Sequence, residues 1–294
     1  MPEMISPAGA LRKLLDGEDV VMAPGAFSPI VARLVAEAGF SAVYLTGAGI
    51  AAGLYGQPDV GLVTLSEVVA AARYTVESAG IPVICDADTG FGNPINVRRT
   101  VMELESAGVA ALHIEDQTFP KKCGYFTGHT LVSPTDMTQR IQAAVDARRD
   151  PDLLLIARTE MLGARDLDET IARAQAYREA GADMIFVNGM RTEEEGIRVA
   201  KEVPGLLLYN VSSSGQAPHL HVSRLKELGY RLVIYPAHTL FFAIHGIKEL
   251  LTDLKRDGDI SSWLDQMIDF QEWQRLTEVP QIEDLERRYS GQKG

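Results

Sequence analysis

The stretch Ile81-Pro-Val-Ile-Cys-Asp86-Ala-Asp88-Thr-Gly-Phe-Gly92-Asn93 joins an apolar run to two acidic residues and two glycines. The apolar run predicts a buried strand, the glycines a tight turn, and Asn93-Pro94 the cap and first residue of a helix. The i, i+2 spacing places the carboxylates of Asp86 and Asp88 on one face of the strand end. We therefore expect a site on a strand-to-helix loop, with two solvated acids as the plainer alternative.

Similar units recur along the chain. Eight short apolar runs alternate with segments of helical spacing, and they lie at 20–23, 42–45, 82–86, 110–115, 153–158, 184–187, 206–210 and 232–235. Nearly continuous apolar character is typical of strands that are covered on both faces. Ala-Gly pairs end four of the helical segments, at 38–39, 79–80, 107–108 and 180–181, where glycine is the usual residue beyond a helix.

Eight strand-and-helix units predict a (β/α)8 barrel over residues 1–258, with a short helix at 7–15 before the first strand. A doubly wound open sheet is the alternative, but no glycine-rich dinucleotide motif follows the first strand. Residues 259–294 are expected to form a C-terminal helical extension. Its aromatic stripe packs either on the chain's own barrel or on another subunit, and it consists of Trp263, Phe270 and Trp273.

The composition of the 294 residues is typical of a soluble globular protein, with 46% hydrophobic and 23% charged residues. The formal net charge of -12 argues against nucleic acid or an anionic membrane as a partner. Two cysteines are too few for a disulfide framework, and Cys85 is expected to be a small core residue. Because no signal peptide or membrane span is recognisable, we expect a cytoplasmic protein.

Polar residues follow the predicted strands, at the end of the barrel where active sites lie. They are Tyr44, Thr46 with the adjoining Gly47-Ala48-Gly49, Asp59, Asp86, Asp88, His113, Glu115, Arg158, Asn188, Asn210, Ser212 and Ser214. Glu115 adds a third carboxylate to the pair at 86 and 88. Three acids rarely gather without a cation, and hard oxygen ligands of this kind suit Mg²⁺.

Three features of this set have alternative interpretations. Arg158 is expected to hold a substrate carboxylate bidentately, unless it pairs with Glu160. His113 either belongs to the site or is a buried, hydrogen-bonded core histidine. The serines near 212 either bind a carboxylate or form a turn before Gly215.

A long loop at 118–129 lies between the fourth strand and the helix that starts near Ser133-Pro134, and its length makes it a candidate lid. Cys123 lies in this loop beside Lys121 and Lys122. Their positive charge is expected to lower the pKa of the thiol and make it usable as an acid or base. The alternative is an idle surface loop.

Together these motifs resemble the isocitrate lyase and phosphoenolpyruvate mutase superfamily, most closely its methylisocitrate lyase-like branch. The resemblance covers almost the whole chain and rests chiefly on Asp86-Ala-Asp-Thr-Gly-Phe-Gly92 and Lys121-Lys-Cys-Gly124. Further matching segments lie at 24–27, 44–49, 113–117, 156–159 and 174–177. The resemblance implies a (β/α)8 barrel, Mg²⁺ with Mn²⁺ as a substitute, a small 2-oxo or 2-hydroxy acid substrate, and a homotetramer with exchanged C-terminal helices.

By position, the resemblance implies that Asp86 and Asp88 hold Mg²⁺ while Asp59 and Glu115 assist through water. It implies catalytic roles for Tyr44, Lys121, Cys123 and Arg158, with the Cys123 thiol protonating the carbanion that retro-aldol cleavage produces. It implies that the substrate is bound by Thr46, Gly47, Ala48, Gly124, Tyr125, Asn188, Asn210, Ser212 and Ser214. Tyr125 and Asn188 depart from the histidine and glutamate that isocitrate and methylisocitrate lyases generally have, so the resemblance defines the chemistry better than the substrate.

These expectations lead to a Mg²⁺-dependent carbon–carbon lyase that cleaves a branched 2-hydroxy di- or tricarboxylate of the dimethylmalate or methylisocitrate type. An oxaloacetate-type hydrolase or decarboxylase is the second hypothesis, because it needs the same metal pocket but no proton from the thiol. Phosphonopyruvate chemistry is less favoured, because the mutases generally lack the Lys-Lys-Cys-Gly loop. The complete metal set argues against a catalytically silent acid-binding barrel.

Overall fold

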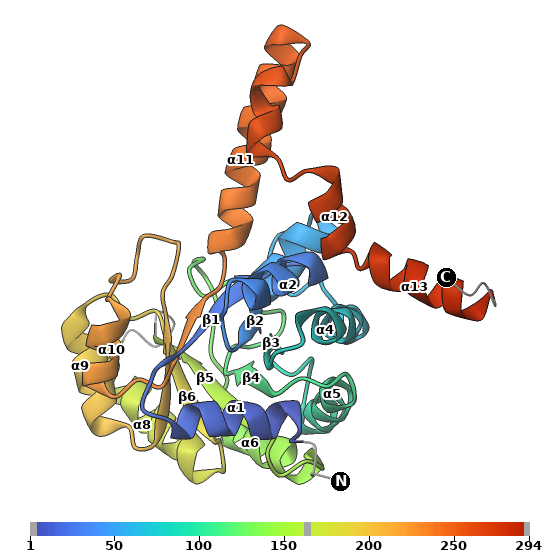
Figure 1. Cartoon of the computed structure of the whole chain (residues 1–294). Helices are drawn as coiled ribbons and strands as arrows, with labels where there is room; N and C mark the ends of the chain where they lie inside the picture. Colours follow the sequence, from blue (N-terminus) through green and yellow to red (C-terminus); the bar gives the residue numbers. More distant parts are fainter. Residues whose placement is uncertain (1–4, 162–165, 291–294) are drawn as a thin grey trace. The chain divides into compact units, whose positions relative to one another are not determined.

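The computed structural model describes residues 5–161 and 166–290, and in these residues eight parallel strands form a closed barrel in chain order (Figure 1). The strands are β1 (Val21–Ala26), β2 (Val43–Leu45), β3 (Val83–Asp86), β4 (Ala111–Glu115), β5 (Leu154–Glu160), β6 (Met184–Asn188), β7 (Leu206–Asn210) and β8 (Leu232–Tyr235). Each strand overlaps its predicted apolar run. The predicted (β/α)8 fold is therefore confirmed.

Helices surround the barrel. They are α2 (Pro29–Glu37), α3 (Gly47–Gly49), α4 (Leu65–Ala79), α5 (Pro94–Ser106), α6 (Pro134–Ala147), α8 (Leu167–Glu179), α9 (Glu193–Glu202) and α10 (Val222–Leu228), and α3 continues into the π-helical turn η1 (Ile50–Leu54). The predicted helix ends are confirmed, because Gly39, Gly80, Gly108 and Gly181 all have positive φ angles between 64° and 108°. Asn93 and Ser133 cap α5 and α6, as their sequences indicate.

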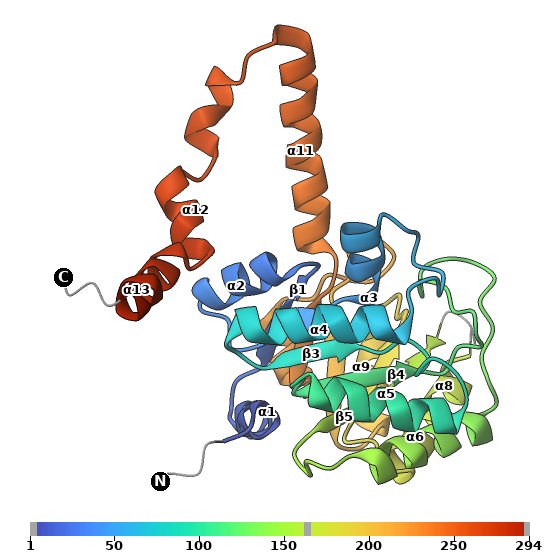
Figure 2. The same cartoon turned by 90° about the vertical axis from the view of Figure 1, so that its right-hand side faces the viewer.

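Two hydrophobic layers stabilise the barrel. One lies between the strands and the outer helices, and the other fills the barrel interior. The predicted N-terminal helix is α1 (Pro7–Asp16), whose Leu11 and Leu15 belong to the interior layer together with Leu154 and Met184. Figure 2 shows α1 at the lower left, on the side where the strands begin, so this helix covers the N-terminal end of the barrel and leaves the other end to polar residues.

The strand register brings complementary polar groups together at the carboxyl ends of the strands. Asp86 of β3 is aligned with His113 of β4, and Glu115 of β4 with Arg158 of β5. Further round, Glu160 of β5 is aligned with Asn188 of β6. Successive strands therefore place acids beside bases or amides, which makes one continuous polar site.

The C-terminal part of the chain contains α11 (His238–Asp257), the 3₁₀ helix η2 (Ser261–Gln266), α12 (Phe270–Leu276) and α13 (Val279–Tyr289). Contacts divide the chain into two compact units, Met1–Leu240 and Phe241–Gly294, so the division falls within α11 and before the expected boundary at 258. In the second unit, the Phe270 and Trp273 rings stack with their centroids 5.3 Å apart. None of the helices in the described residues combines the length and apolarity that crossing a bilayer requires.

Candidate active site

Asp86 and Asp88 lie at the end of β3, but strand alternation does not explain how their carboxylates come to face the same site. β3 ends at Asp86, and Asp88 lies beyond it with a φ of 48°, in the left-handed region that few aspartates adopt. The backbone N–H of Asp88 donates to Asp86 Oδ1 over 3.0 Å. Both carboxylates face Gly47, where a Cβ atom would lie 2.7 Å from Asp86 Oδ2 and 3.3 Å from Asp88 Oδ1. Position 47 is therefore restricted to glycine.

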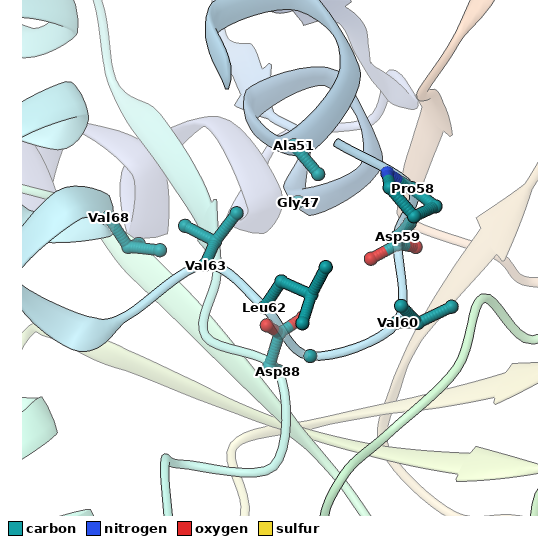
Figure 3. Close-up of a pocket in the computed structure, with 10 residues that line it drawn as sticks. Gly47, Ala51, Pro58, Asp59, Val60, Leu62, Val63, Val68 and Asp88 are labelled. Atoms are coloured by element: carbon teal, nitrogen blue, oxygen red, sulfur yellow. The ribbon is translucent and has the colours of Figure 1, made fainter. Parts of the chain in front are cut away.

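Lys121 lies between two carboxylates of the site. Its Nζ is 2.5 Å from Asp59 Oδ1 and 2.7 Å from Asp88 Oδ1. Burial by itself would lower the pKa of Lys121, but Asp88 and Asp59 raise it well above its ordinary value. Figure 3 shows both acids in the wall of a small pocket that Leu62 and Val63 also line. Lys121 therefore places a positive charge among the carboxylates of Asp86, Asp88 and Asp59. We call this part of the site its acidic end.

The carboxylates of Asp86 and Asp88 differ in acidity. Burial raises the pKa of Asp88 to about 6, with Asp86 and Asp59 adding to the effect and Lys121 opposing it. The pKa of Asp86 is lowered despite its burial, because positive neighbours stabilise its charge. His113 is uncharged at neutral pH, since burial lowers its pKa to about 4, so Lys121 and Arg158 supply that positive charge.

Arg158 pairs with Glu160, the alternative that the sequence left open. Its Nη2 and Nε lie 2.5 and 2.6 Å from Glu160 Oε1, and Nε lies 3.2 Å from Glu115 Oε2. The side-chain amide of Asn188 donates to the second oxygen of Glu160 over 3.0 Å. Glu160 is a site residue that the sequence interpretation treated only as a competitor for Arg158. The predicted contact between Arg158 and a substrate carboxylate stays a prediction.

Tyr44 and His113 form a buried pair beside Asp86. The Tyr44 hydroxyl lies 2.7 Å from His113 Nε2 and donates to Asp86 Oδ2 over 3.3 Å. His113 thus satisfies both interpretations, because it is buried and hydrogen-bonded but also contacts a predicted catalytic residue. Thr46 follows at the end of β2, where its hydroxyl accepts from Gly49 N–H at the start of α3. Ala48 lies in the same short helix and is partly exposed.

The thiol of Cys123 is protonated at neutral pH and can therefore act as a proton donor. The expected lowering of its pKa is wrong, because burial raises the pKa above the ordinary value and outweighs the opposing effects of Arg158 and Lys121. Lys121 is directed at Asp59 and Asp88, and Lys122 Nζ donates to the backbone oxygens of Thr127 and Gly128. The backbone N–H of Cys123 donates to Asp59 O over 2.9 Å. A protonated thiol is therefore held next to the acidic end of the site.

The remaining predicted substrate-binding residues meet at the ends of β6 and β7. The hydroxyl of Tyr125 lies 3.4 Å from Asn188 Oδ1, and the Asn210 amide donates to that same oxygen over 3.0 Å. Ser212 donates to Ser214 over 2.8 Å. Burial raises the pKa of Tyr125 to about 12, so it stays a neutral hydroxyl. Tyr125, Asn188 and Asn210 line a shallow depression together with Val187, Met190, Tyr209 and Ala217.

Gly124 allows the loop to approach this part of the site. A Cβ atom at 124 would clash with Glu160 Oε2 and lie 2.5 Å from Asn188 Nδ2. The loop backbone therefore packs directly on the polar end of β5 and β6. The structure brings the loop residues 121–125 together with the strand-end residues, as the sequence predicts.

A model of the phosphoenolpyruvate phosphomutase family matches residues 11–255 of the chain. The chain belongs to the phosphoenolpyruvate mutase and isocitrate lyase superfamily. It is 43% identical to a 2,3-dimethylmalate lyase of Eubacterium barkeri over 97% of this chain and 99% of that protein. It is 44% identical to a probable 2-methylisocitrate lyase of Corynebacterium glutamicum over 94% of this chain and 89% of that protein.

Solved structures of superfamily members share the fold over nearly the whole chain. A crystal structure of a 2,3-dimethylmalate lyase has a TM-score of 0.91 at 37% identity and covers 98% of this chain and 96% of its own. An oxaloacetate acetylhydrolase in complex with 3,3-difluorooxalacetate has a TM-score of 0.89 at 35% identity, covering 98% and 97%. The superfamily resemblance and the prediction of a carbon–carbon lyase of this superfamily are confirmed.

The chemistry of the acidic residues fits a divalent cation, as expected for this superfamily. Glu115 Oε1 is buried without a polar partner, while Asp88 Oδ1 and Glu115 Oε2 contact only the cations of Lys121 and Arg158. In residues 5–161 and 166–290, no three His, Cys, Asp or Glu side chains are placed to ligate one ion together. Two carboxylate ligands supplemented by water match the habit of Mg²⁺, which keeps several of its waters.

Proposed function

We propose that this superfamily member is a Mg²⁺-dependent lyase that cleaves a branched 2-hydroxy di- or tricarboxylate, of the 2,3-dimethylmalate or 2-methylisocitrate type. The products are a 2-oxo acid such as pyruvate and a second carboxylic acid. The observation that carries the proposal is the protonated Cys123 thiol, held beside Asp59 by its own backbone. The names of the relatives at 43% and 44% identity support the substrate type.

As the carbon–carbon bond breaks, the 2-hydroxyl group gives up its proton to solvent and becomes the 2-oxo group. The electron pair of the broken bond stays on the carbon next to a carboxylate, and that carbon must receive a proton. Cys123 is the group that supplies it, because burial keeps its thiol protonated at neutral pH. Lys121 and Arg158 place positive charge near the substrate carboxylates, although each is also paired with acids of the site. Tyr44, whose hydroxyl donates to Asp86, is the group that we assign to the 2-oxygen of the substrate.

In this proposal Asp86 and Asp88 hold Mg²⁺, and Asp59 and Glu115 assist through water. When bound, the ion supplies Lewis acidity at the oxygen that becomes the 2-oxo group of the product. The buried Glu115 Oε1 supports this assignment, since a buried carboxylate oxygen without a polar partner is costly. A cytoplasmic location belongs to the same proposal and is supported by two free cysteines.

A second function is favoured by one comparison. The likeness to oxaloacetate acetylhydrolase suggests hydrolysis of an oxaloacetate-type acid in the same pocket. Such a reaction adds water to the carbonyl carbon before the carbon–carbon bond breaks, and the released carbon again takes up a proton. The two functions therefore differ in the substrate, a 2-oxo or a 2-hydroxy acid, and in the release of oxalate.

The experiment is a panel of 2-hydroxy di- and tricarboxylates, incubated with the enzyme and Mg²⁺, with pyruvate release coupled to lactate dehydrogenase. We expect release from a branched 2-hydroxy acid that stops with chelator and returns with Mg²⁺. Full cleavage activity in a Cys123→Ser variant would contradict the assignment of Cys123 as the proton donor. If the enzyme releases oxalate from oxaloacetate and cleaves none of the 2-hydroxy acids, the result supports the hydrolase instead.

A further inference from the structure

Gln117 makes two hydrogen bonds to the backbone of the loop that carries Cys123. Its Nε2 donates to Lys122 O over 2.7 Å, and Lys122 N–H donates to its Oε1 over 2.9 Å. The side-chain amide therefore pairs with the main chain of Lys122 as a neighbouring strand would. Gln117 is fully buried, so water does not compete for either hydrogen bond.

The base of this side chain is held in place by the two ends of the loop. Gln117 and Leu131 form an antiparallel bridge, and Thr118 N–H donates to Thr130 O over 2.8 Å. The Thr118 and Thr130 hydroxyls lie 2.7 Å apart. Since the backbone at 117 is fixed on the barrel side, its amide fixes the Lys122 peptide rather than following it.

The residues on either side of Lys122 are the ones that the proposed chemistry uses. Lys121 Nζ reaches Asp59 and Asp88, and Cys123 N–H donates to Asp59 O. A shift of the Lys122 peptide moves both neighbours, because they are joined to it by single backbone linkages. Gln117 is fully buried, and the two hydrogen bonds of its side-chain amide both go to the loop backbone, so we assign it no contact with the substrate.

We propose that Gln117 is a positioning residue for Cys123, which sets the place of the thiol through the Lys122 peptide. The inference rests on the proposed function, because it takes Cys123 as the proton donor. Its loss is expected to slow proton transfer while leaving the acidic end of the site, formed by Asp86 and Asp88, able to bind a small acid. Misplacement of a catalytic group by about 1 Å costs on the order of 100-fold in rate.

Two variants test this role. Gln117→Met keeps the length of the side chain and removes both hydrogen bonds, and Gln117→Glu keeps the acceptor for Lys122 N–H but sets a carboxylate oxygen against Lys122 O. Thr130→Val is the matched control, because it removes only the exposed hydroxyl contact with Thr118 and keeps the backbone hydrogen bonds that fix residue 117. Thermal unfolding of all four proteins shows that each variant is folded.

The first readout needs no substrate. Iodoacetamide alkylation reports on Cys123 alone, because the other cysteine, Cys85, is fully buried. We expect both Gln117 variants to be alkylated about tenfold faster than the wild type, and Thr130→Val to match the wild type. Equal alkylation rates in the folded Gln117 variants and the wild type overturn the proposal. If Gln117→Met does not fold, Gln117→Glu decides alone.

The second readout is steady-state cleavage together with calorimetric binding of oxalate in the presence of Mg²⁺. We expect kcat to fall about 10- to 100-fold while the oxalate dissociation constant stays within about threefold of the wild type. A rise in KM with unchanged kcat overturns the positioning role. If the wild type cleaves no 2-hydroxy acid, the proposed function fails, yet alkylation still decides whether Gln117 positions the thiol.

Discussion

The acidity of Cys123 gives a pH dependence that belongs to a single residue. A proton donor is active in its protonated form, which is present below its pKa and lost as pH rises through it. Because burial raises this pKa, we expect kcat for cleavage to be level through neutrality and to fall only above the ordinary thiol value of about 8.5.

Cys123→Ser replaces the thiol by a much weaker acid, so kcat is expected to fall by about 10²- to 10⁴-fold. The alkaline decline should shift with this change. The measurement is kcat of both proteins from pH 6 to 10, with the fold checked at both pH limits by circular dichroism. The wild type and the variant share all other titratable groups, so a difference between their pH profiles reports on Cys123. An identical decline in both proteins would assign it to another residue.

At this scale the sequence predicts which residues meet but not how they are connected. Spacing pointed to Asp86 and Asp88, yet Asp88 reaches the site through a left-handed backbone conformation rather than along the strand. Glu160 was missed as a partner of Asn188 because their contact depends on the register of β5 and β6. Pairing between distant strands leaves no local signal, and a single glutamine such as Gln117 leaves none either.

At the scale of elements, α1 closes the N-terminal end of the barrel and makes a testable contribution to stability. Leu11 is fully buried in the interior layer, so Leu11→Ala leaves a cavity at the end of the core. We expect a loss of about 2–5 kcal/mol in the free energy of unfolding, measured by urea denaturation. Ile95→Ala on α5, where the side chain is 72% exposed, is the control and should change it by no more than about 0.5 kcal/mol. Similar losses in both variants would remove the special role of α1.

The eight strands were predictable because each is a short apolar run bounded by glycine or proline, whereas α3 and η1 were not. Residues 47–54 contain Gly47, Gly49 and Gly53, a composition that disfavours a helix. Tight packing explains why glycine stands there, since a Cβ atom at 53 would lie 2.8 Å from the Phe27 ring. Long-range packing overrides local propensity at this point, next to the acidic end of the site.

For the whole molecule, the C-terminal unit predicts assembly. In the single chain, the large apolar side chains of Phe242, Phe270 and Tyr289 are 78%, 69% and 76% exposed. Such a concentration of exposed apolar groups is typical of a surface that another subunit covers. The predicted homotetramer with exchanged C-terminal helices supplies that cover, and we expect sedimentation equilibrium to give about four times the chain mass of 32.0 kDa.

Phe270→Glu places a charge in this surface and should shift the equilibrium towards smaller species, because burying an unpaired carboxylate between subunits is costly. Tyr74→Glu is the matched control, since Tyr74 is 62% exposed on α4 of the barrel unit. We expect the control to sediment as the wild type does. A wild type that sediments as a monomer across the micromolar range would show that the exposed aromatic residues serve no self-assembly, and equal dissociation of both variants would place the interface elsewhere.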